Sequence, residues 1–247
     1  MRKKSMNILA LQFVILLVLA KPALADALDD VQAGLEAQTL KKLELAITHY
    51  TKAIHSGGLS RGTLAIVFAS RANAYSRKSR HKLAIKDFNE VIRLTPGDPQ
   101  AYFSRGLVYS SSGQHDQAME DFGEVIRLRP ASARAFGNRG VAYYKKGLHD
   151  LAIKDFDQAI RLNPNEAKAF NNRGNAYSEK SQYDQAIDDY NRAINLKPDY
   201  AQAFFNRGIA YHKKGQYKMA AKDFKKAIRM KPVFATTFLF WSSLISD

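Results

Sequence analysis

One arginine recurs at a fixed interval of 34 residues along most of this chain. The five copies are Arg71, Arg105, Arg139, Arg173 and Arg207, and the interval between them never varies. A constant period of this length with helical patterning is typical of arrays of stacked helical hairpins. The sequence therefore predicts an all-α fold, built as an elongated body without a single central core.

Other positions of the 34-residue frame repeat the same residue types. With Ala133 as position one, position four is always aromatic and position eight is alanine or glycine. Position eleven is tyrosine, twenty is alanine, twenty-four is phenylalanine or tyrosine, and thirty-two is proline. Positions four, eight and eleven share one face of a first helix, and positions twenty, twenty-four and twenty-seven share one face of a second. The frame predicts two helices per unit, and the proline ends the second.

A glycine follows the first predicted helix in three units, at Gly113, Gly147 and Gly215. Helices often end on a left-handed residue, and glycine adopts that conformation without steric cost. We expect these glycines to form the turn of each hairpin.

Taken together, these positions resemble the tetratricopeptide repeat family. The resemblance implies a right-handed α-solenoid of stacked antiparallel helical hairpins over residues 61–234. Its five predicted units are 65–98, 99–132, 133–166, 167–200 and 201–234.

Both ends of the array depart from the repeat. Residues 26–60 are interpreted as a degenerate first repeat, in which Tyr50 keeps its place but Ala37 stands where tyrosine belongs. Terminal units of such arrays are atypical because they face water on one side. Residues 235–247 continue the register for half a unit, which predicts a C-terminal capping helix.

Charged residues recur as well. Arginine at position seven is matched by aspartate at position twenty-three in every unit: Asp87, Asp121, Asp155, Asp189 and Asp223. We interpret these as structural ion pairs between packed helices. Lys145 and Lys146, with the matching residues of other units, end a first helix, where the helix dipole favours cations.

The sequence predicts no catalytic site, no metal site and no cofactor. There is no cysteine, which excludes disulfides, thiolate metal sites and thiol catalysis. His81, His115 and His149 share position seventeen, but neighbouring helices pack about 8–10 Å apart. Zinc needs ligand nitrogens about 2 Å from one ion. We interpret these histidines as substitutes for an aromatic packing residue.

The N-terminus has the three parts of a secretory signal peptide. Basic residues 2–4 precede an apolar run over 8–20, and small residues at 23 and 25 then flank Leu24. This predicts a leader over 1–25 that is cleaved after Ala25. A bilayer-spanning helix needs about 20 residues, so a membrane contact through an uncleaved leader is the less favoured interpretation. The protein is expected to be exported, and periplasmic in a Gram-negative bacterium.

The net charge of the chain is +15. The leader carries Arg2, Lys3, Lys4 and Lys21 and no acid, so the mature chain has 15 − 4 = +11. A basic chain can bind nucleic acid, but export separates this one from most nucleic acid, and no nucleic-acid partner is expected.

The resemblance places the first helices along a concave inner groove, to which positions two, five, six, nine, twelve and thirteen contribute. Position six reads Ser70, Ser104, Asn138, Asn172 and Asn206. These residues lie outside the four, eight and eleven set, so packing does not explain them. An amide carries donors and an acceptor together, so an evenly spaced row can bind the backbone of an extended peptide. The superhelix of the O-linked N-acetylglucosamine transferases carries a similar asparagine ladder.

Further residues complete the predicted groove. Phe103, Tyr144 and Phe205 supply exposed rings, which suit peptide side chains, and Asn171 and Asn175 add amides. The family's clamp for a C-terminal carboxylate needs lysine at position five, which this chain lacks, so a co-chaperone role of that type is not supported. At the C-terminus, Leu239, Phe240 and Trp241 form a predicted apolar contact patch for a second copy, as a homodimer, or for the partner. The alternative is that the short capping helix tilts and buries most of this patch.

The sequence thus predicts a non-catalytic, exported scaffold that binds an extended peptide segment of a protein partner. Two alternatives stay open. One is binding of an envelope polymer, peptidoglycan or polysaccharide, because amides, aromatics and scattered cations also suit sugars. The other is an accessory subunit of an enzyme or secretion complex.

Overall fold

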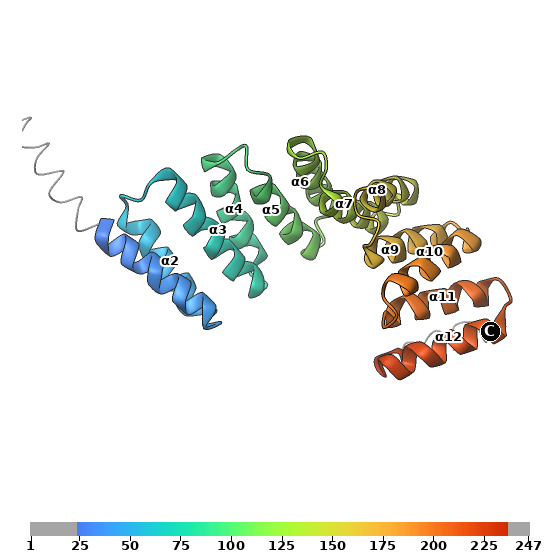
Figure 1. Ribbon diagram of the computed structural model, residues 1–247. Coiled ribbons are helices and arrows are strands. Elements are labelled where there is room, and N and C mark those ends of the chain that lie inside the picture. Colours follow the sequence, from blue (N-terminus) through green and yellow to red (C-terminus); the bar gives the residue numbers. More distant parts are fainter. Residues whose placement is uncertain (1–23, 237–247) are drawn as a thin grey trace, which may run out of the picture. The chain divides into compact units, whose positions relative to one another are not determined.

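The computed structural model describes residues 24–236, and these are almost entirely helical, with no strand among them (Figure 1). All but the last two residues of the predicted leader lie outside this range. Most of the predicted cap, including Leu239, Phe240 and Trp241, also lies outside it.

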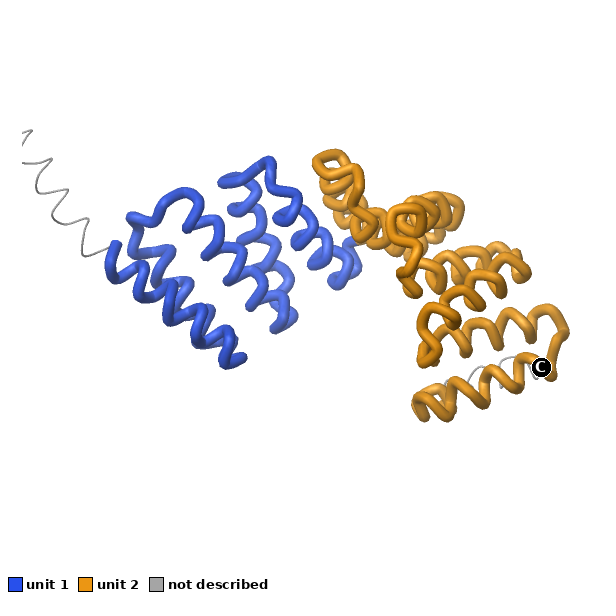
Figure 2. The backbone as a smooth tube through the Cα atoms, in the orientation of Figure 1, with its two compact units in different colours: residues 1–114 blue, residues 115–247 orange. Residues whose placement is uncertain are grey.

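The chain divides into two compact units, one up to Gln114 and one from His115 (Figure 2). The division falls within the predicted repeat 99–132, between its two helices. Each unit is described separately below.

The first unit begins with a helix over residues 24–39, which corresponds to the first helix of the degenerate repeat. The four helices that follow are α2 (Leu43–Ser56), α3 (Arg61–Arg77), α4 (His81–Leu94) and α5 (Pro99–Ser111). Helix α3 packs on α4 to form a hairpin, α2 packs on α3, and α5 packs on α4. Helix α3 starts at Arg61, four residues before Ala65, where the repeat predicted a unit to begin.

The second unit contains three full hairpins preceded by α6. Its helices are α6 (His115–Leu128), α7 (Ala133–Lys145), α8 (His149–Leu162), α9 (Ala167–Glu179), α10 (Tyr183–Leu196), α11 (Ala201–Lys213) and α12 (Tyr217–Met230). Helices α7 and α8, α9 and α10, and α11 and α12 form hairpins, and each second helix packs on the first helix that follows it. This is the stacking of antiparallel hairpins that the 34-residue period predicted.

The hairpin turns have the predicted left-handed residue. Gly113, Gly147 and Gly215 have φ angles of 77°, 74° and 74°. After Gly147, the Leu148 N–H donates to the Tyr143 carbonyl oxygen at 2.9 Å, which satisfies a carbonyl at the helix end. Other turns place Lys41, Ser79 and Ser181 at the same position with φ 58°. The chain therefore keeps the turn geometry even where glycine is absent.

Close contact between the two helices of a hairpin explains the small residue at position eight. A Cβ atom on Gly140 would lie 2.8 Å from Cε1 of Phe156, and the same addition on Gly174 would meet Tyr190 at 2.8 Å. The alanine at position twenty is fully buried in this contact, as Ala152 shows. The large rings at position twenty-four thus occupy the space that small residues leave.

The predicted ion pairs are confirmed in the hairpins that lie within one compact unit. Arg139 donates from Nε and Nη2 to the two oxygens of Asp155, at 2.7 and 2.9 Å. The equivalent two-point pairs are Arg71–Asp87, Arg173–Asp189 and Arg207–Asp223. Each guanidinium also lies between the rings of positions four and eleven, 5.7 Å from both centroids for Arg139. This cation–π contact adds to the pair.

Neighbouring hairpins are joined by two further polar contacts. Where position twenty-five of the preceding second helix has a polar side chain, the arginine at position seven donates to it from Nη1, as Arg207 does to Asn191 at 2.6 Å. The lysine at position fourteen pairs with an acid at position eighteen of that helix, as Lys146 does with Asp116 at 2.9 Å. The same lysine pairs are Lys78–Glu44, Lys180–Asp150 and Lys214–Asp184. These lysines therefore do more than interact with the helix dipole.

Candidate functional site

The position-six residues predicted to bind a partner all lie on first helices and are all half-buried. Ser70 and Ser104 lie on α3 and α5 of the first unit. Asn138, Asn172 and Asn206 lie on α7, α9 and α11 of the second. The helical register thus gives the three asparagines the same place on three consecutive hairpins, as predicted.

Asn206 is bonded within the protein, which corrects the expectation that packing does not explain it. Its Nδ2 donates to Oδ1 of Asn175 at 2.9 Å and to Oδ1 of Asn171 at 3.2 Å. Its own Oδ1 accepts from Nε2 of Gln202 at 2.8 Å. Asn171 is only 3 % exposed. Because a buried amide without a partner is costly, Asn206 helps to hold α11 on α9.

Tyr190 extends this amide cluster into the hairpin. Its hydroxyl donates to Oδ1 of Asn175 at 2.8 Å. The other full units carry phenylalanine at this position, and only the unit with Asn175 carries tyrosine. In this unit the tyrosine hydroxyl and the amide of Asn175 therefore satisfy each other, whereas unit 65–98 pairs the equivalent Asn73 with Phe88 and has no such hydroxyl.

Asn138 and Asn172 have more of their hydrogen-bonding capacity left. Asn138 donates from Nδ2 to the Arg134 carbonyl oxygen of its own helix at 2.7 Å. The side chain of Asn172 makes no hydrogen bond to any residue in the range 24–236. In the first unit, Ser104 accepts from Nε2 of Gln100 at 3.1 Å. The free amide groups of the predicted row are thus those of α7 and α9.

Two of the predicted groove aromatics are buried, so their assignment as exposed rings was wrong. Phe103 is 6 % exposed and Phe205 is 4 % exposed. The Phe205 ring packs against Phe224 and Phe234, with centroids 5.4 and 4.9 Å away. Position five thus contributes to packing between helices rather than to an open surface.

Tyr144 is half-buried on α7 and contacts the following hairpin. Its hydroxyl donates to Oε1 of Glu179 at 3.2 Å, and its ring lies 5.5 Å from that of His149. Burial, together with the negative charge of Glu179, raises the pKa of Tyr144 to about 12. The phenol is therefore neutral at physiological pH and links α7 to α9.

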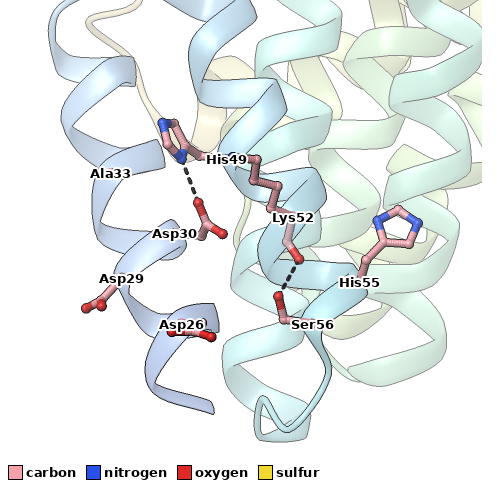
Figure 3. A pocket seen from close by; sticks show the side chains of 8 residues that line it. All are labelled: Asp26, Asp29, Asp30, Ala33, His49, Lys52, His55 and Ser56. Carbon is pink, nitrogen blue, oxygen red and sulfur yellow. Dashed lines mark hydrogen bonds and ion pairs between the residues drawn. The ribbon is translucent and has the colours of Figure 1, made fainter. Parts of the chain in front are cut away.

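The first unit has an open cavity of about 800 Å³ that the sequence did not predict. It lies between helix 24–39 and α2, and Figure 3 shows its lining: Asp26, Asp29, Asp30, Ala33, His49, Lys52, His55 and Ser56. Ala33 stands at position seven, where every later unit has the arginine, and His49 stands at position twenty-three. His49 Nδ1 lies 2.7 Å from Oδ1 of Asp30. The missing arginine was the sequence signal for this cavity.

A second cavity, of about 420 Å³, lies between α11 and α12. Phe204 and Met219 give it apolar walls, and most of its remaining lining is cationic: Arg207, Lys222, Lys225, Lys226 and Arg229, with Asp223.

Within residues 24–236, no group of three or more metal-ligating side chains comes together. His149 packs on Tyr144, in agreement with an aromatic packing role. In the same range, no helix is both long and apolar enough to cross a bilayer.

Family models match most of the repeat region. Three models are described as tetratricopeptide repeat. One matches residues 133–166 and 201–233, the second matches 156–188, and the third matches 70–122. A model described as TPR repeat matches residues 108–147 and 174–215. The chain belongs to the tetratricopeptide repeat (TPR) family. No curated protein sequence is significantly similar to this TPR protein.

Solved structures share the same fold. The crystal structure of a MamA protein has 27 % identity and a TM-score of 0.63, and covers 71 % of this chain and 96 % of its own. MamA from Desulfovibrio magneticus RS-1 has 22 % identity and a TM-score of 0.64, over 68 % of this chain and 96 % of its own. YrrB is described as a TPR protein with an unusual peptide-binding site. It has 24 % identity and a TM-score of 0.59, and the match covers 76 % of this chain and 96 % of YrrB. The fold of these proteins is that of a protein-interaction scaffold.

Proposed function

We propose that this TPR protein is an exported, non-catalytic scaffold that binds an extended peptide segment of a partner across α7 and α9. The observation that carries the proposal is the pair Asn138 and Asn172. Both lie at position six of consecutive first helices. Within residues 24–236 the Asn172 side chain makes no hydrogen bond, and the Asn138 amide makes only one, from Nδ2 to the Arg134 carbonyl oxygen. The peptide-binding site described for YrrB, a TPR protein of the same fold, supports this choice of ligand.

The chemistry of the two side chains fits a peptide backbone. An amide offers a carbonyl acceptor and an NH₂ donor, and an extended backbone offers the complementary C=O and N–H groups at each residue. Recognition of this kind gives affinity independent of sequence, while neighbouring side chains supply specificity. Tyr144, with its neutral hydroxyl, is on α7 with Asn138 and adds a half-buried ring.

Peptide capture tests the proposal. A partner segment selected from a peptide library is titrated against wild type and against a variant carrying Asn138→Ala and Asn172→Ala. We expect binding to weaken by about tenfold or more, because about 1 kcal/mol is lost per hydrogen bond. The matched control carries Asn165→Ala and Asn195→Ala, which removes two exposed amides elsewhere. Equal binding by all three proteins, or binding of glycan fragments in place of peptides, would contradict the proposal.

Export is tested separately. The basic start, the apolar run and the small residues before Asp26 motivate cleavage after Ala25. N-terminal sequencing of protein recovered from the native host should begin at Asp26. Recovery of the uncut chain in the membrane fraction would contradict both cleavage and export in soluble form.

A further inference from the structure

Helix α12 carries a stripe of four cations that no other second helix has. Lys218, Lys222, Lys225 and Arg229 lie at intervals of four, three and four residues, which places them on one helical face. All four are exposed, and none forms an ion pair with a residue in the range 24–236. The stripe borders the cavity between α11 and α12.

Two residues of the stripe occupy the positions that join one hairpin to the next. Inside the array, an acid at position eighteen accepts the lysine of the following hairpin in most units, as Asp184 does from Lys214. A polar side chain at position twenty-five accepts the following arginine in most units, as Asn191 does from Arg207. On α12, Lys218 and Lys225 stand at these two positions. Since two cations repel each other, an ordinary repeat with arginine and lysine at positions seven and fourteen is a poor fit to α12.

Helix 24–39 departs from the repeat in the opposite way, because it lacks cations and carries acids where it would stack on another hairpin. Position seven is Ala33 and position fourteen is Leu40, so both cations are missing. Positions three and ten are the acids Asp29 and Glu36, both exposed. In all five later units these positions are alanine or valine, and they are at most 5 % exposed against the preceding helix. Figure 3 shows Asp29 pointing away from α2, while Asp30 is turned toward His49.

We propose that α12 is a docking surface for a second copy of this chain, and that its occupant is the acidic face of helix 24–39 in that copy. Two acids would meet the four cations of the stripe at the positions where internal hairpins stack. Because the two surfaces differ, the contact is heterologous and adds copies head to tail. The opposite signs favour this occupant over a membrane surface or an unrelated acidic protein, because the acids sit at the stacking positions themselves.

Sedimentation of the chain from Asp26 to Asp247 tests the proposal. At about 0.02 M salt the average mass should rise steadily with protein concentration, and at about 0.5 M salt the protein should be monomeric, because salt screens exposed charges. One variant carries Lys222→Glu and Lys225→Glu, and another carries Asp29→Lys and Glu36→Lys. Each alone should lose association by more than about tenfold.

The decisive sample is an equimolar mixture of the two variants. The acidic α12 of one variant can then bind the basic helix 24–39 of the other, because their charges are opposite. The mixture should therefore associate again at low salt. A control with Lys82→Glu and Lys86→Glu on α4 has the same charge change and should associate like wild type. The proposal is overturned if wild type stays monomeric at low salt, as it would if residues 237–247 cover the stripe. It is also overturned if the mixture stays monomeric, or if the α4 control loses association as much as the α12 variant does. If wild type does not self-associate but binds anionic vesicles, the stripe is a membrane-binding surface instead.

Discussion

Arg173 and Asp189 form a two-point contact between the helices of one hairpin, at 2.8 Å from Nε and 2.6 Å from Nη2. The Nη1 of the same guanidinium donates to Asp157 of the preceding hairpin at 2.6 Å. One arginine therefore joins two hairpins through two carboxylates. The Asp189 side chain is 7 % exposed and that of Asp157 is 46 % exposed.

This difference in burial predicts unequal effects of two matched variants. Asp189→Asn should lower the free energy of unfolding by about 3–5 kcal/mol, because it leaves a buried cation without its main partner. Asp157→Asn should cost less than about 1 kcal/mol, as expected for an exposed pair. Urea denaturation measures both. Equal losses would show that the inner carboxylate is not the one that holds the hairpin together.

The amide cluster predicts that the three asparagines at position six are not equivalent. Asn206→Ala should destabilise the protein by about 1–3 kcal/mol, because buried Asn171 loses a partner. Asn172→Ala should change the free energy of unfolding by no more than about 0.5 kcal/mol, because the Asn172 side chain makes no hydrogen bond within the described residues. Thermal unfolding of the two variants checks this. A neutral Asn206→Ala would show that the bonds between α9 and α11 contribute nothing measurable.

The turn at Ser181 is held in a conformation that suits glycine. Its φ is 58°, and a left-handed residue with a side chain costs about 1–2 kcal/mol. Ser181→Gly should therefore stabilise the protein, by somewhat less than that because glycine also gains freedom in the unfolded chain. The reverse change, Gly147→Ser at the equivalent turn, should destabilise it. If both changes shift the melting temperature in the same direction, the backbone explanation fails.

Tyr144 predicts a loss of stability in alkaline solution. Its pKa is about 12 in the folded protein and about 10 in an unfolded chain. The folded state therefore holds this proton more tightly, so the contribution is complete below about pH 10 and is lost as the pH rises toward about 12.

Two variants isolate this effect from other groups that titrate in the same range. Tyr144→Phe should lose less stability than wild type between about pH 10 and about pH 12. Glu179→Gln should lower the pKa of Tyr144, because it removes a nearby negative charge. Tyrosinate absorbance follows the titration directly. An unchanged profile in both variants would rule out this contact as the cause.

Much of the fold follows from the sequence because the 34-residue frame repeats both shape and charge. Gly140 and Phe156 predict close helix packing through their sizes alone, and the arginine and aspartate of each unit predict a pair through their opposite signs. These signals are local to one hairpin, so the period is enough to locate both partners.

Contacts between hairpins were harder to predict because their positions vary in residue type. Position five reads alanine, phenylalanine, glycine, asparagine and phenylalanine through the five units, which hid the burial of Phe103 and Phe205. A polar residue such as Asn206 fits an open surface and a buried cluster equally well. Its partners lie 31 and 35 residues away, and only the offset between stacked hairpins brings them together.

Site-specific photo-cross-linking tests the central claim, that a partner binds along α7 and α9. A photoreactive phenylalanine replaces Asn172 in one protein and Asn195, an exposed residue of α10, in another. The account predicts that Asn172→benzoylphenylalanine is cross-linked to a partner polypeptide in the native compartment, and that the Asn195 variant is not. Cross-linking from the Asn195 position alone, or equally from both, would contradict it.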